Sequence, residues 1–270
     1  MADNGKDGEI DTSAAEAFEK YLVPTIFGPW SEAMIDHART EENHRLLDVG
    51  CGSGAAARYA AQIVGTGGSV SAIDFNAGMI AHARTLDPNR RIDWQQGDVT
   101  DMPYNDGAFD IVAGNQLLQF LPDKEKGLSE MKRVLTDKGR LALTVYCAPH
   151  RNPAHAAVAT SLEKHGIDAK GVVHPFSFGD PVMLGDLLQD AGFKDVSVVR
   201  KQMDSYFPSA ENFIECLAAG GPSSRHALEQ LDADGLKSLK AEVTETLAEF
   251  VDPKKGLRVI TAANMALARA

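Results

Sequence analysis

Three glycines follow a short apolar run in the segment LLDVGCGSG, residues 46–54, and give the first chemical signal in this sequence. Gly50, Gly52 and Gly54 alternate with other residues and lead into alanine-rich sequence that is typical of a helix. Because glycine has no side chain, its backbone can turn sharply and approach a ligand closely. The spacing predicts a strand-to-helix turn that holds a cofactor, and it is also compatible with a dinucleotide site or with a plain tight turn.

Three further features are placed to contact a ligand at that turn. Asp48 precedes the first glycine by two residues. Asp74 ends a second apolar run, and a carboxylate about 20 residues past such a turn can accept hydrogen bonds from both ribose hydroxyls. Gly97, Asp98 and Val99 follow a third apolar run, where they could meet an adenine edge. Together these features favour a cofactor site, although Asp74 or Asp98 could instead cap the segment that follows it.

The elements that position these residues alternate along the chain. Helical or loop segments separate five strand-like runs, at Arg45–Val49, Ser69–Ile73, Ile92–Gln95, Phe109–Ala113 and Arg140–Tyr146. Such alternation predicts a parallel sheet with helices on both faces. In sheets of this kind ligands bind beyond the carboxyl ends of the strands, and the glycine turn follows one of these ends. The intervening helices are expected at Ala55–Ile63, Ala77–Thr85 and Lys124–Leu135, with a turn at Asp137–Arg140.

The flanking segments differ in character from this core, residues 45–146. Residues 1–13 are acidic and polar and predict a disordered tail. Residues 14–40 predict two short lid helices joined by an aromatic elbow at Phe27–Trp30. After the core we expect two helices, a strand, a helical cap and a last strand, all within a single domain of residues 14–270. Their ranges are Pro153–His165, Asp180–Ala191, Lys194–Phe207, residues 207–252 and Gly256–Ala270.

The composition indicates the cellular compartment and excludes some classes of binding partner. The net charge of −11, with no run of lysine or arginine, argues against nucleic acid and anionic membranes as partners. Cys51, Cys147 and Cys216 are too widely spaced for a zinc site or a disulfide framework, which indicates a reducing compartment. We find no signal-peptide pattern and no apolar run long enough to cross a bilayer, and we expect a cytoplasmic protein.

At four places in order, the sequence resembles the class I S-adenosylmethionine-dependent methyltransferases, and within them the small-molecule, ubiquinone-biosynthesis-like branch. The matching segments are LLDVGCGSG, AIDFNAGM, QGDVTDMPYNDGAFDIV and NQLLQFLPDKEKGLSEMKRVLTDKGRLAL. The resemblance implies a Rossmann-like α/β fold with a mainly parallel seven-stranded sheet, helices on both faces and a helical cap. It also implies that the last strand lies antiparallel beside the fifth.

The resemblance assigns cofactor contacts by position. Gly50, Gly52 and Gly54, with Cys51 between them, would line the methionine and ribose portions, and Asp48 would orient that loop or the cofactor amino group. Asp74 would hold the ribose. The adenine would contact Phe75, Met79, Gly97, Asp98 and Val99, while Asn115 and Gln116 would face the methionine portion and the sulfur. Met79 has helical spacing and could equally be plain core.

The chemistry implied is methyl transfer from S-adenosyl-L-methionine to a small molecule by in-line displacement, which leaves S-adenosyl-L-homocysteine and needs no metal. Positioning is the main requirement, and a base is needed only for a protonated acceptor. The weak base candidates are Tyr146, His150, His155 and His174, and Arg151 could pair with an anionic group. Tyr21, Phe27 and Trp30 would form an aromatic rim for an apolar acceptor, or would only fasten the first helices to the sheet. The residues leave open whether carbon, nitrogen, oxygen or sulfur is methylated.

Three other readings compete with this one. A nucleotide-cofactor dehydrogenase would share the glycines and Asp74, but the chain has no Tyr-x-x-x-Lys pair. A non-catalytic regulator that binds S-adenosylmethionine would keep the same cofactor residues. A nucleic-acid methyltransferase would carry Asn or Asp followed by Pro-Pro and an aromatic residue where this chain reads GNQLLQF. A P-loop is excluded because no glycine is followed by lysine and then serine or threonine.

Overall fold

The computed structural model describes residues 10–270, except the side chains of residues 222 and 223. Residues 1–9 of the predicted acidic tail lie outside the described residues, and Ser13, the last residue of that tail, already begins helix α1. Within the described part, no helix is both long enough and apolar enough to cross a membrane. Cys51, Cys147 and Cys216 are buried free thiols.

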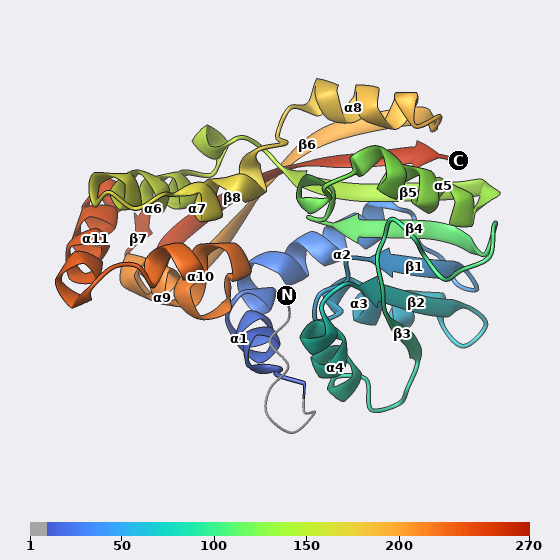
Figure 1. The fold of residues 1–270 in the computed structure, drawn as a ribbon, viewed down its shortest axis with the longest axis horizontal. Coiled ribbons are helices and arrows are strands. Elements are labelled where there is room, and N and C mark those ends of the chain that lie inside the picture. Colours follow the sequence, from blue (N-terminus) through green and yellow to red (C-terminus); the bar gives the residue numbers. More distant parts are fainter. Residues whose placement is uncertain (1–9) are drawn as a thin grey trace.

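One mixed sheet organises the described residues, with strand order β3-β2-β1-β4-β5-β8-β6 and the short β7 paired to β8 (Figure 1). Strands β1 to β5 are mutually parallel, and β8 lies antiparallel between β5 and β6. The predicted α/β fold, with its last strand antiparallel beside the fifth, is confirmed. The strands are β1 Arg45–Val49, β2 Ser69–Asp74, β3 Ile92–Gln96, β4 Phe109–Asn115, β5 Leu135–Tyr146, β6 Lys194–Phe207, β7 Val251–Asp252 and β8 Gly256–Arg269.

Helices cover both faces of the sheet, which explains why the central strands read as nearly continuous apolar runs. On one face, α2, α3 and α4 pack into an apolar cluster with β1, β2 and β3. On the other face, α5 and α8 pack against β5, β6 and β8. The core helices are α2 Gly28–His37, α3 Ala55–Val64, α4 Ala77–Thr85, α5 Lys124–Val134 and α8 Pro181–Asp190.

A two-stranded ribbon extends past the carboxyl end of β5. Strand β8 pairs with β5 only through Ala263–Arg269, whereas Leu257–Ala262 pairs with β6, and Leu257 also with Val251 of β7. Helices gather around this extension, at the left of Figure 1, and form a third apolar cluster. They therefore stand beyond the sheet edge at which ligands bind in parallel sheets. The remaining helical elements are α1 Ser13–Tyr21, η1 Val23–Phe27, η2 Leu118–Phe120, η3 Pro149–Arg151, α6 Pro153–Lys164, α7 Lys170–Val173, η4 His174–Phe176, α9 Ala210–Gly220, α10 Pro222–Leu228, α11 Ala233–Thr246 and η5 Ala248–Phe250.

Two local predictions need correction. The break between the lid helices is a π-helical turn at Val23–Phe27, and α2 begins directly at Gly28, so Phe27–Trp30 is not an elbow. The predicted turn at Asp137–Arg140 lies inside β5. There the register with β4 jumps from the Phe109–Leu135 pair to the Ile111–Arg140 pair, so the extra residues of β5 bulge out of the ladder.

Candidate active site

The glycine turn between β1 and α3 has a left-handed backbone at each of its three glycines. The φ angles are +64° at Gly50, +54° at Gly52 and +88° at Gly54, a region that other residues rarely adopt. A Cβ at Gly54 would lie 2.2 Å from the Trp94 ring, and one at Gly50 would lie 2.5 Å from Leu117. A Cβ at Gly52 would meet only Phe18, at 3.8 Å. Gly50 and Gly54 therefore allow close protein packing, while Gly52 opens toward a cavity.

Asp74, at the end of β2, connects the turn to the next helix. Its Oδ2 accepts a hydrogen bond from the Gly52 amide at 2.8 Å, and its Oδ1 accepts one from the Asn76 amide at 2.8 Å. Asn76 in turn caps α4. Burial raises the pKa of the Asp74 carboxyl, and these two amide hydrogen bonds act against that shift. Asp74 is thus both a cap and a partner of the glycine turn.

Asp48 lies beneath the same turn and is 1% exposed. Its Oδ2 accepts a hydrogen bond from the Ala57 amide in the first turn of α3, at 3.0 Å. Burial, with a smaller contribution from the charge of Asp74, raises the pKa of the Asp48 carboxyl to about 7. This carboxyl is therefore poised to change charge near neutral pH.

Helix α1 is fastened to the glycine turn by Glu19. Its Oε2 accepts a hydrogen bond from the Ser53 hydroxyl at 2.5 Å, and its Oε1 pairs with Arg58 Nη2 at 2.6 Å. Both partners are more than 30 residues away in sequence, so no local pattern could have indicated these contacts. The predicted lid helix is held against the turn by an ion pair that is about three-quarters buried on each side.

The end of β4 places two amide side chains beside the turn. Asn115 uses its side chain within the protein, since Nδ2 donates to Ser31 Oγ at 3.0 Å and Oδ1 accepts from Thr144 Oγ1. Gln116 has a φ of +56°, unusual for a non-glycine residue, and is 4% exposed. Its Nε2 is a buried donor for which the described residues supply no hydrogen-bond partner. Asn115 thus positions α2, and Gln116 carries the free polar group.

A cavity of about 370 Å³ opens between the glycine turn and the helices around the β6–β8 ribbon. At one end, here called the turn end, it is lined by Asp48, Gly50, Cys51, Gly52, Asp74 and Met79. The other end, here called the aromatic end, is lined by Leu22, Ile26, Tyr146, His155, Val172, Phe176 and Leu217. The cavity is large enough for a small-molecule site.

The structure brings many of the predicted site residues to this cavity. They are Asp48, Gly50, Cys51, Gly52, Asp74, Met79, Asn115, Gln116, Phe27, Tyr146 and His155. Gly54 packs on Trp94 instead. Phe75, Gly97, Asp98 and Val99 lie next to Asp74 but outside the cavity lining: the Gly97 amide donates to the Asp74 carbonyl at 3.0 Å, and Phe75 is 79% exposed. Asp98 accepts hydrogen bonds from Thr100, as the capping alternative predicted.

Several acceptor-site predictions do not reach the cavity. Trp30 is fully buried and donates to Thr261 Oγ1 at 2.9 Å, so it holds α2 to β8 and is no part of an accessible rim. Tyr21 packs against the third apolar cluster without lining the cavity. His150, Arg151 and His174 are exposed, and the His174 ring lies 5.7 Å from the ring of the lining residue Phe120. The sequence did not indicate that Phe176 and Leu217 line the cavity, because both look like ordinary helix core.

The charge of the cavity lining indicates which class of cofactor it can bind. Two carboxylates, Asp48 and Asp74, stand at the turn end, and the described lining residues include no lysine or arginine. A dinucleotide pyrophosphate would meet these carboxylates without a compensating cation. A ligand with a positive charge and hydroxyl donors is favoured there. The carboxylates and the open side of Gly52 therefore fit S-adenosylmethionine, whose ammonium and sulfonium outweigh its one carboxylate and whose ribose supplies hydroxyl donors.

Comparison with known proteins supports the same conclusion. The family model described as "Methyltransferase domain" matches residues 47–143, which run from β1 into β5. The aklanonic acid methyltransferase DauC of Streptomyces sp. (strain C5) is 35% identical over 149 residues, which are 53% of this chain and 68% of that protein. The chain belongs to the class I S-adenosylmethionine-dependent methyltransferases. The resemblance read from the sequence is confirmed, and the dehydrogenase alternative is wrong.

Two further relatives extend the match beyond the core. The nocamycin O-methyltransferase of Saccharothrix syringae is 27% identical over 237 residues, 82% of this chain and 84% of that protein. A solved structure of Haemonchus contortus phosphoethanolamine N-methyltransferase 2 with S-adenosyl-L-methionine has a TM-score of 0.60 at 17% identity, covering 96% of this chain and 57% of that one. At that identity the likeness shows the shared fold. The cofactor of this methyltransferase is S-adenosylmethionine.

Replacing Gly54 tests the close packing of the turn. Gly54→Ala should lower the free energy of unfolding by about 1–2 kcal/mol for the left-handed backbone. It should lose about 1–3 kcal/mol more because the new methyl group overlaps the Trp94 ring. Gly166→Ala is the matched control, since Gly166 has a φ of +73° and nothing lies within 4 Å of its Cβ position. Equilibrium urea unfolding measures both, and equal losses would contradict the packing role of Gly54.

Proposed function

We propose that this methyltransferase transfers the methyl group of S-adenosylmethionine to a small, largely apolar molecule by in-line displacement. The observation that supports the proposal most directly is the single cavity that joins the carboxylates of the turn end to the apolar wall of the aromatic end. Bound S-adenosylmethionine supplies a methyl group already activated on a positively charged sulfur. The protein then has to orient an acceptor and exclude water, and proximity alone can contribute about 7–11 kcal/mol.

The turn end would hold the cofactor through contacts of differing chemistry. Asp74 would accept from the ribose hydroxyls, since each carboxylate oxygen has a lone pair beyond its present hydrogen bond. Phe75, exposed beside Asp74, offers a ring face for the adenine. Asp98 follows Gly97, whose amide donates a hydrogen bond to the Asp74 carbonyl. Asp48 would attract the cofactor ammonium, and Gly52 leaves room for the methionine portion.

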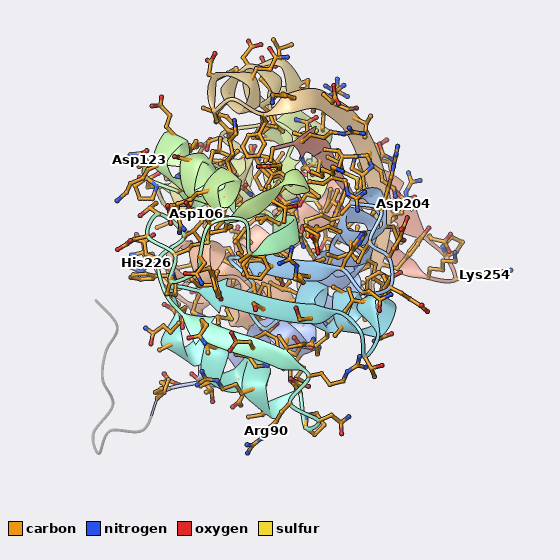
Figure 2. The ribbon with its side chains drawn as sticks, turned by 90° about the vertical axis from the view of Figure 1, so that its right-hand side faces the viewer. Arg90, Asp106, Asp123, Asp204, His226 and Lys254 are labelled. Atoms are coloured by element: carbon orange, nitrogen blue, oxygen red, sulfur yellow. The ribbon has the colours of Figure 1, made fainter. Side chains whose placement is uncertain are left out.

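Small molecules are the expected partners, and several observations agree. The relatives reported above are named for nocamycin and aklanonic acid, which fits a small-molecule acceptor. The cavity has no lysine or arginine among its described lining residues, and the chain carries a net charge of −11, which argues against a nucleic-acid substrate. Figure 2 shows Arg90, Asp123 and Lys254 projecting from the outer surface, at separate places on it. The cytoplasmic setting remains a prediction.

Asp74→Ala should weaken binding of both S-adenosylmethionine and S-adenosylhomocysteine in calorimetric titrations. Loss of hydrogen bonds to a charged group typically costs about 1.5–3 kcal/mol, which is roughly a ten- to hundredfold loss in affinity. Asp186→Ala, which removes an exposed carboxylate from α8, is the control and should leave both affinities unchanged. Unchanged affinity in Asp74→Ala would contradict the placement of the ribose. Wild-type protein that binds both ligands but methylates no small molecule would support the regulator alternative instead.

The affinity for S-adenosylmethionine should fall as the pH decreases below about 7. A cofactor ammonium beside Asp48 favours the ionised carboxylate, so below its pKa binding must first release a proton. The loss should approach tenfold for each pH unit. Asp48→Asn should abolish this dependence. The matched probe is 5′-methylthioadenosine, which lacks the ammonium and should bind equally well across the same range. A parallel decline for both ligands would show that another group is responsible.

A further inference from the structure

The aromatic end contains a histidine whose ring nitrogens have no hydrogen-bond partner among the described residues. His155, on α6, is 9% exposed and lines the cavity. Its ring lies 5.0 Å from the Phe176 ring and 5.2 Å from the Phe213 ring, measured between centroids. Among the described residues no hydrogen bond involves either ring nitrogen; Nδ1 is fully buried, and Nε2 is the ring nitrogen that protein atoms do not fully enclose. The imidazole is therefore held in place by packing alone, facing the cavity.

A histidine with a purely structural role is normally hydrogen-bonded when buried. His165, at the end of the same helix, shows the contrast, because its Nε2 lies 3.1 Å from Glu242 Oε1. Burial lowers the pKa of His155 to about 4, so the ring is neutral at pH 7 and offers one nitrogen as a hydrogen-bond acceptor. A buried acceptor without a partner is costly, and a ligand that donates a hydrogen bond to it removes that cost.

Other groups near the aromatic end restrict the acceptor further. The Tyr146 ring stacks 5.0 Å from Phe176, so a flat apolar ring finds aromatic neighbours on this wall. The two lining carboxylates, Asp48 and Asp74, belong to the turn end, and no lysine or arginine appears among the described lining residues. A carboxylate or phosphate ester would meet no countercharge here, and an ammonium would meet none at this end.

Building on the proposed function, we propose that the acceptor is an uncharged aromatic or enolic compound with a hydroxyl group, and that His155 accepts the hydroxyl proton during methylation. The acceptor oxygen forms a bond to the methyl carbon while the carbon–sulfur bond breaks. The O–H bond breaks and the proton moves to the free ring nitrogen of His155, giving an imidazolium. The products are a methyl ether and S-adenosylhomocysteine, and the proton leaves to solvent after product release.

The charges in the cavity favour protonation of His155 during methyl transfer and oppose it before the transfer. A sulfonium in the cavity opposes protonation of His155 before methyl transfer, because two positive charges would then share one pocket. The sulfonium charge disappears as the methyl group leaves, so the imidazolium replaces one positive charge with another. The cavity therefore holds the same net charge before and after the transfer. The neighbouring rings of Phe176 and Phe213 can stabilise the cation through their π systems.

Matched ring probes test the acceptor class. Wild-type protein with S-adenosylmethionine labelled with ¹³C in its methyl group is incubated separately with 2-naphthol, with 2-(2-naphthyl)ethylamine, which is an ammonium at neutral pH, and with 2-naphthoic acid. We expect a labelled methoxyl carbon from 2-naphthol, detected by NMR and mass spectrometry, and no product from the other two. Methylation of the amine or the acid, or no turnover of the naphthol by protein that binds the cofactor, would overturn this inference. Failure to bind S-adenosylmethionine at all would instead overturn the proposed function.

The role of His155 is tested by the pH dependence of methylation in a variant. His155→Phe keeps a ring of similar shape, and it should lower kcat for 2-naphthol by about 10²–10⁴-fold, the usual contribution of a positioned base. The loss should shrink by about tenfold for each pH unit between 7 and 9, because in the variant only hydroxide can remove the proton of 2-naphthol. An equal loss at every pH would mean that the ring only shapes the pocket. Unchanged binding of S-adenosylhomocysteine by the variant confirms that the turn end is intact.

Discussion

The turn end depends on the two hydrogen bonds that the Asp74 carboxylate accepts from backbone amides. One fixes Gly52 in a left-handed conformation, and the other fixes Asn76 at the start of α4, so a single side chain sets two strand-to-helix junctions. Burial alone would make this carboxylate costly, and the amide donors offset part of that cost. The proposed cofactor site is therefore preformed in the protein backbone, and its described lining has no lysine or arginine side chain.

The second constraint is the length of the last two strands. Because β6 and β8 continue beyond the end of β5, they carry an apolar surface past the edge of the parallel sheet, and α6 and α9 cover it. The same helices bring His155 to the cavity lining and place Phe213 against its ring. In our account, the ends of the parallel strands bind the cofactor, and the β6–β8 extension shapes the acceptor pocket.

Local pattern predicted most of the fold and the turn end, because strand alternation and glycine spacing are properties of neighbouring residues. The strand Lys194–Phe207 has the bounds that the sequence indicated. Long-range contacts escaped prediction. Trp30 resembles a rim residue in sequence, and only its partner Thr261, 231 positions away, shows that it is core. His155 could not be separated from exposed His150, because burial between aromatic rings from two later helical segments leaves no local signal.

The central claim is that one cavity holds the cofactor at the turn end and the acceptor at the aromatic end. A crystal structure of the complex with S-adenosylhomocysteine and 2-naphthol tests it most directly. We predict ribose hydroxyls on Asp74, adenine against Phe75, and the naphthol hydroxyl within hydrogen-bond distance of His155. S-adenosylhomocysteine occupying the aromatic end, or naphthol bound with its hydroxyl turned away from His155, would contradict the account.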